Sequence, residues 1–162
     1  MSDTVGVSFL DLLAYNHSET ERWHAWFMQN PKAFDVVVGG KMNTVRELVA
    51  HIFQAELFFA GLLAGDETPK TAYVYNSVDE MFAMHEKAHG MLAHYIEHAG
   101  EDEMAKMHEL PWKEGLRVSS RKLLTQCFLH SVNHWGQIAM EVRQAGMPSE
   151  GPHDIILSKV MP

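Results

Sequence analysis

Four segments of the sequence repeat apolar residues every three or four positions, the spacing that gives an α-helix one apolar face. They cover residues 7–29, 44–65, 77–100 and 119–145, and glycine or proline ends or follows each of them. Each is long enough for a helix of about 30 Å, because an α-helix rises about 1.5 Å per residue. The pattern predicts an all-α fold, a four-helix bundle that forms a single domain over residues 1–162.

Local signals mark the ends of the predicted helices. Thr44 followed by Glu47, and Ser77 followed by Glu80, have the spacing of a capping box, which predicts two helix starts. The fourth segment stops at Gly146, with a proline shortly beyond. These signals agree with the limits that the apolar pattern gives.

The connections leave the order of the helices open. The link at residues 66–76 extends to about 36–40 Å, so the chain could either return along the bundle or turn back directly. Residues 101–119 lack a helical period and predict an excursion with a short extended piece. The tail, residues 148–162, is expected to drape over the bundle, because its Ile-Ile-Leu run at 155–157 needs apolar cover.

Composition narrows the class of protein. Of 162 residues, 46% are hydrophobic and 21% are charged, as in an ordinary globular protein. The formal charge of −8, without any basic run, argues against nucleic acid as a partner. The longest apolar run, residues 57–65, is too short to span a membrane, and residues 1–9 lack the pattern of a secretory signal. The single cysteine fits a reducing compartment, so the cytoplasm is the expected location.

The fourth segment carries two histidines at the spacing of a metal site. On a helix, His130 and His134 differ by about 40° in rotation and about 6 Å in rise, so both can bind one ion. A chain with 11 histidines also produces such a pair by chance, as two half-buried side chains with local partners. Cys127 lies one turn before His130. It could be a reactive thiol or a small buried core residue, and a buried core residue is the more usual role.

The second segment adds His51 at the edge of its apolar face. With the pair on the fourth segment it would give three neutral nitrogen ligands and an open position, which is typical of catalytic metal sites. A rival pair, His85 and His89, has the same four-residue spacing on the third segment and also leans toward the core. Spacing alone does not choose between the two sets.

A carboxylate-bridged di-iron centre is a weaker interpretation. Such a bundle carries Glu-x-x-His on two helices, and this chain has Glu21 with His24 and Glu86 with His89. In both pairs the glutamate lies about 120° from the centre of the apolar stripe, so it faces away from the core. The motif is present, but its helical phase disfavours the centre.

Two longer motifs connect the chain with a known family. They are "ELVAHIFQAELFFAGLLAG" at residues 47–65 and "HSVNHWGQIAMEVRQAGMP" at residues 130–148. The His-x3-His-x-Gly-Gln run followed by "RQAGMP" is the more specific part. On these residues the chain resembles the DinB/YfiT-like family of metal-binding four-helix bundles, and the likeness extends loosely to the helix count and the "GPHD" tail.

The resemblance implies a particular ligand set, because the family's three metal-binding histidines fall on His51, His130 and His134. It also implies nickel or zinc as the divalent ion, an up-down-down-up helix order and a homodimer. Trp135 departs from the family, which often has a basic residue at that position. This difference could alter the rim of the site, but it removes no ligand.

A divalent ion at such a site would acidify a bound water or thiol, so two reaction classes follow. One is hydrolysis of a small-molecule ester or amide. The other joins a low-molecular-weight thiol, such as bacillithiol, mycothiol or glutathione, to an electrophilic substrate. The resemblance favours the thiol-dependent S-transferase, and no residue chooses between the two. A non-catalytic metal-binding or stress-response bundle is the alternative from another class.

Glu56 is the candidate for a general base, because it lies within the apolar face of the second segment, where a carboxylate needs a partner. It could instead orient a metal-bound histidine, as Glu47 or Asn133 could. An ion pair with an arginine or histidine of another helix, with a purely structural role, is the more ordinary interpretation.

Overall fold

The computed structural model describes residues 6–40, 42–66, 75, 77–149, 151 and 153–160. Its long helices are α1 (Phe9–Gln29), α2 (Val45–Leu63), α3 (Val78–His98) and α5 (Ser120–Gln144). The short elements are η1 (Pro31–Asp35), α4 (Glu101–Ala105), β1 (Met107–Glu109), β2 (Arg117–Ser119) and η2 (Ile155–Leu157). The four predicted helices are confirmed, and their ends lie close to the predicted ones.

Side-chain oxygens cap the predicted helix starts. Thr44, Ser77 and Ser119 each accept a hydrogen bond from the backbone N–H three residues later. The carboxylate of Glu47 accepts from the backbone N–H of Asn43, and not from that of Thr44, so the predicted capping box there is incomplete. These caps fix where the chain enters each helix.

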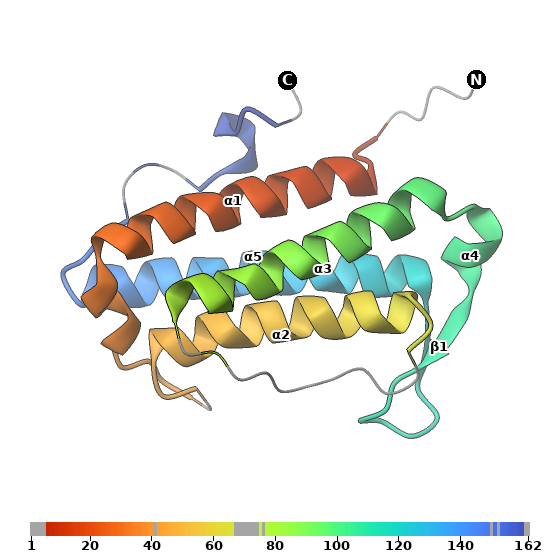
Figure 1. Cartoon of the computed structure of the whole chain (residues 1–162), viewed down its shortest axis with the longest axis horizontal. Helices are drawn as coiled ribbons and strands as arrows, with labels where there is room; N and C mark the ends of the chain where they lie inside the picture. The colour runs from red at the N-terminus through yellow and green to blue at the C-terminus, as the bar shows by residue number, and fades with distance from the viewer. Residues whose placement is uncertain are drawn as a thin grey trace.

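The long helices lie side by side in the order up-down-down-up (Figure 1). α1 and α5 run in one direction, and α2 and α3 run in the other. α2 packs against α3 and α5, and α1 packs against the same two helices. The all-α bundle and the helix order are therefore confirmed, whereas the connection at 66–76 lies mostly outside the described residues.

Apolar side chains fill the space between the helices along the whole bundle. One cluster gathers around Trp23, Phe27 and Phe53, and a second gathers around Phe58 and Phe128. α2 contributes to both clusters, so its polar side chains lie within the core or at its edge. Within the described residues, no helix has the apolar length that crossing a lipid bilayer requires.

The chain between α3 and α5 forms the short helix α4 and a β-hairpin at one end of the bundle (Figure 1). β1 pairs with β2 in antiparallel register, with His108 opposite Val118. Val118 and Leu110, which lies in the turn, are buried in the core cluster at this end. The predicted extended piece is thus confirmed, while α4 was not predicted.

The C-terminal tail lies beside α1, as Figure 1 shows, but the predicted reason is wrong. The side chains of Ile155–Leu157 are exposed and cover no part of the core. His153 holds the tail instead, because Tyr15 donates its hydroxyl hydrogen to the His153 carbonyl at 2.6 Å. The Nδ1 of His153 also lies 2.8 Å from the carboxylate of Glu19.

Candidate metal centre

His51 on α2 faces His130 and His134 on α5, where these two helices pack together. One ring nitrogen of each histidine lies within 4.8 Å of the other two. The ring centroids are 4.9 Å apart for His51 and His130, 5.1 Å for His51 and His134, and 4.4 Å for His130 and His134. The fold therefore brings together the three histidines that the sequence proposes as ligands, and each is half-buried.

Burial and neighbouring rings lower the pKa of two of these histidines, His130 and His51. The pKa of His130 falls to about 4, because burial disfavours the imidazolium and because His134 and His51 lie beside it. Burial, followed by the effect of His134, also lowers the pKa of His51. A neutral imidazole keeps a nitrogen lone pair at physiological pH, which is the form that binds a metal ion.

The contact between His51 and His130 fits a shared cation. Their Nε2 atoms lie 3.1 Å apart, and two neutral ring nitrogens attract at this distance only when a proton or a cation lies between them. The Nδ1 of His130 is buried and has no hydrogen-bond partner among the described residues, so this ring makes its polar contact through Nε2. Three imidazole nitrogens are donors that zinc, nickel and related divalent ions prefer.

Gln137 orients the third ring. Its Oε1 lies 3.2 Å from Nδ1 of His134, three residues earlier on α5. An amide oxygen accepts a hydrogen bond, so His134 carries its proton on Nδ1 and leaves Nε2 free for a ligand. This role was not predicted from the sequence, although the i, i+3 spacing on a helix is the available signal.

The cluster has an open side. Within the described part of the chain, no fourth histidine, cysteine, aspartate or glutamate joins the three histidines. Three protein nitrogens with a free position form the arrangement of catalytic zinc sites, whereas structural sites are closed by a fourth protein ligand.

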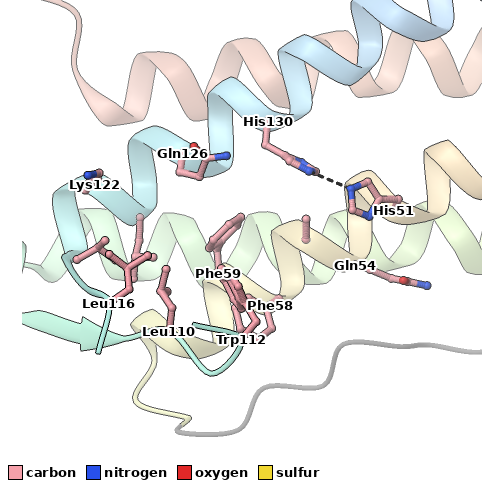
Figure 2. A pocket seen from close by; sticks show the side chains of 13 residues that line it. His51, Gln54, Phe58, Phe59, Leu110, Trp112, Leu116, Lys122, Gln126 and His130 are labelled. Carbon is pink, nitrogen blue, oxygen red and sulfur yellow. Dashed lines mark hydrogen bonds between the residues drawn. The ribbon is translucent and has the colours of Figure 1, made fainter. Parts of the chain in front are cut away.

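A cavity of about 500 Å³ opens beside His51 and His130. Figure 2 shows both rings at one end of it and a group of aromatic and aliphatic side chains toward the other end. This size suits a small organic molecule. The wall comes from α2, the hairpin and α5, and its residues are His51, Gln54, Ala55, Phe58, Phe59, Leu110, Trp112, Leu116, Val118, Lys122, Leu123, Gln126 and His130.

Few polar groups interrupt the apolar wall of this cavity. Lys122 is the one cation among the described lining residues, and no carboxylate is found among them. Trp112 of the hairpin packs against Phe58 of α2, with ring centroids 5.1 Å apart. This wall was not predicted from the sequence, because residues 101–119 carry no periodic pattern that would indicate a packed surface.

Glu56 lies in the core, and its hydrogen bonds go to side chains other than the three histidines, so its predicted role as their base or orienting partner stays a prediction. Its carboxylate accepts hydrogen bonds from Asn16 Nδ2 at 2.8 Å and from Ser131 Oγ at 2.7 Å. The Nδ1 of His85 lies 2.7 Å from its other oxygen. The side chain is 1% exposed and does not line the cavity, so the ordinary interpretation, a pairing with a histidine of another helix, describes it.

Cys127 and Trp135 also belong to the core. Burial raises the pKa of the Cys127 thiol well above its usual value, which makes it a packing residue and not a reactive thiol. Trp135 stacks on Trp23 with ring centroids 5.4 Å apart, so it does not form the rim of the site. The aromatic residues of the cavity are instead Phe58, Phe59 and Trp112.

The rival pair on α3 does not join the cluster. His85 is 2% exposed and pairs with Glu56, and His89 stacks on His17 of α1 with ring centroids 4.3 Å apart. Position therefore separates the two sets that spacing left open. His85 and His89 face α1 and Glu56, and the other three histidines lie at the seam of α2 and α5.

The helix order and the histidine cluster define a small helical bundle with a histidine-rich site between its second and last long helices. A model of the DinB family matches residues 1–155, and the chain belongs to this family. Among solved structures, a DinB-like protein from Bacillus subtilis matches with a TM-score of 0.63 and 15% identity, covering 88% of this chain and 96% of that one. A search of curated proteins found no match.

Proposed function

We propose that the protein is a metal-dependent enzyme that binds a divalent transition metal, nickel or zinc, through His51, His130 and His134. The observation that carries this proposal is the cavity, because His51 and His130 belong both to the histidine cluster and to its wall. A purely structural or sequestering site needs no such space beside the ion. The cavity and the open side therefore favour an enzyme over a non-catalytic metal-binding or stress-response bundle.

The chain's own residues supply position and environment. When bound, a divalent ion held by neutral imidazoles lowers the pKa of a coordinated water or thiol. Gln137 holds the His134 ring in place, and the apolar wall excludes water from a substrate. Lys122 offers an ammonium group to a carboxylate on the substrate or on a thiol cofactor.

Thiol transfer is the reaction class that we propose first. Hydrolysis commonly uses a general base near the attacking water, and no described lining residue is a carboxylate. An S-transferase needs the acidified thiol and an apolar space for the electrophile. The family resemblance favours the same class, and a metal-dependent hydrolase is the alternative.

Elemental analysis of the purified protein tests the ligand set. We expect His51→Ala, His130→Ala and His134→Ala each to contain about one ion fewer per chain than the wild type, because two nitrogens hold such an ion poorly. Gln144→Ala is the matched control, since Gln144 is exposed near the end of α5 and has no part in the site. Metal content that is equal in all these samples would refute the site.

A product assay then separates the reaction classes. The metal-loaded protein is incubated with glutathione or bacillithiol and an apolar electrophile, and in parallel with apolar esters. A thioether product supports the transferase, and ester cleavage alone supports the hydrolase. If the fully metal-loaded protein forms neither product, the result supports the non-catalytic bundle.

A further inference from the structure

A second cluster of metal-ligating side chains lies between α1 and α3 and shares no residue with the first. We infer that His17, His85 and Glu86 form a second site for a divalent first-row transition metal. One ligand atom of each residue lies within 4.8 Å of the other two. The first cluster lies at a different seam, between α2 and α5, so the two sites have no ligand in common.

The distances within the second cluster suit a shared ion. Nδ1 of His17 lies 3.1 Å from Nε2 of His85 and 3.9 Å from a carboxylate oxygen of Glu86. Two ring nitrogens this close attract only when a proton or a cation lies between them. The Glu86 carboxylate beside them adds the negative charge that a divalent ion needs.

Glu56 prepares His85 for metal binding. It accepts the hydrogen bonds of Asn16 and Ser131, and its pKa is lowered: burial opposes ionisation, but His85 and these two hydrogen bonds outweigh it. The ionised carboxylate accepts the Nδ1 proton of His85 at 2.7 Å. That contact fixes the tautomer and points Nε2 at His17, which is the carboxylate–histidine arrangement usual behind a metal ligand.

The surroundings favour a cation and leave it a way in. The side chain of His17 is 27% exposed and that of Glu86 is 62% exposed. Glu21 also lies 3.9 Å from the second ring nitrogen of His17. An ion entering from solvent therefore meets acidic side chains before it reaches the two imidazoles.

The ring of His17 is held from one side. His89 stacks on it with centroids 4.3 Å apart, which restricts its rotation. Burial, followed by the nearby rings of His17 and His85, lowers the pKa of His89, so this neighbour adds no positive charge. Both ligand rings are thus fixed, His85 by Glu56 and His17 by His89.

The donor set defines the class of ion. Two imidazoles and one carboxylate bind zinc, cobalt or ferrous iron, whereas magnesium and calcium prefer oxygen alone. A proton is the competitor at Nε2 of His85. Burial lowers the pKa of this imidazole, but the Glu56 carboxylate outweighs burial and raises it. Binding experiments therefore belong at about pH 8, where the ring loses its proton more readily to the metal.

Titration of the chelator-treated full chain with Co²⁺ tests the second site, with its absorption spectrum as the readout. We expect the wild type to bind a second Co²⁺ ion besides the one at His51, His130 and His134. His17→Asn and Glu86→Gln should each weaken the second ion at least about tenfold, the smallest loss seen when an orienting partner is removed. Both positions are partly exposed, so these variants should fold.

Two controls separate this site from its alternatives. His130→Ala should lose the first ion and keep the second, so a failure of the proposed function is visible apart from a failure here. His94→Asn removes one of the exposed α3 histidines, and its ring centroid lies 4.3 Å from that of His98. A wild type without a second ion, or a second ion lost in His94→Asn but retained in His17→Asn and Glu86→Gln, would overturn the inference.

Discussion

His134 shows how a single neighbour prepares a ligand. Gln137 accepts a hydrogen bond from its Nδ1–H, so the other nitrogen of the ring is free and the ring has a fixed direction. His130 is kept neutral by its surroundings, since burial and two adjacent imidazoles lower its pKa to about 4. At the residue scale, the site therefore depends on Gln137, which would not itself touch the ion, and on the burial of the ligands.

Replacement of Gln137 tests this dependence. We expect Gln137→Ala to weaken metal binding about 10- to 100-fold, because the His134 ring loses its acceptor. Gln137→Glu keeps an acceptor oxygen and should retain most of the affinity. Competition with a chromophoric chelator measures both, and Gln144→Ala, an exposed change near the end of α5, is the control. Equal affinity in Gln137→Ala and the wild type would contradict the assigned role.

The candidate ligands could be named from the sequence only through the family motif. Histidine spacing alone left His85 and His89 as equals of His130 and His134. The partners of Glu56 could not be predicted, because they come from three helices whose packing no local pattern encodes. The burial of Glu56 was predictable, since its position on the apolar face of α2 already required a partner.

At the scale of elements, the helices were predictable and the hairpin was only partly so. Each long helix carries its own periodic apolar face and its own cap, which are properties of consecutive residues. The hairpin is short, and the burial of its apolar residues depends on their packing against α2 and α5, which no local pattern predicts. Leu110 and Val118 are buried there, although nothing local distinguishes them.

The hairpin's contribution to the cavity can be measured with Trp112. We expect Trp112→Ala to weaken binding of anilinonaphthalene sulfonate, an apolar aromatic anion, roughly tenfold, which corresponds to about 1.4 kcal/mol of lost contact. Metal affinity should not change, because Trp112 is no ligand. Fluorescence titration provides the measurement, and Leu129→Ala is the control, since Leu129 is an exposed apolar residue of α5 outside the cavity. Unchanged affinity for the probe would show that the hairpin is no part of the binding wall.

At the scale of the whole molecule, one carboxylate connects the four long helices. Glu56 lies on α2 and contacts Asn16 of α1, His85 of α3 and Ser131 of α5. Apolar packing alone tolerates sliding and rotation of helices, whereas these contacts require one register. The group is therefore a determinant of how the helices align, and it joins the seams of the two histidine clusters.

Replacement of Glu56 should destabilise the fold. We expect Glu56→Gln to lower the free energy of unfolding at pH 7 by about 3 kcal/mol, because it removes a buried carboxylate that three side chains hydrogen-bond. Urea denaturation measures this loss. Glu101→Gln is the control and should change the free energy of unfolding by less than about 1 kcal/mol, because the ion pair between Glu101 and Arg121 is exposed. A small effect at Glu56 would mean that packing alone aligns the helices.

The same comparison has a pH dependence with a defined sign. The pKa of Glu56 is lower in the folded chain than its usual value of 4.5. Its stabilising contribution is thus present above that value and is lost as the pH falls through the folded pKa. The difference between wild type and Glu56→Gln should therefore shrink on acidification below pH 4.5, and a difference that grows there would have the wrong sign.

The hairpin provides cavity wall but no histidine of either cluster and no partner of Glu56. Substitutions at Leu110, Trp112 or Leu116 can therefore reshape the space offered to a guest molecule without touching the ion or the alignment of the bundle. Substitutions in this one hairpin can therefore change which small molecules bind to a protein with this fold. Guest selectivity and ion binding are free to evolve separately.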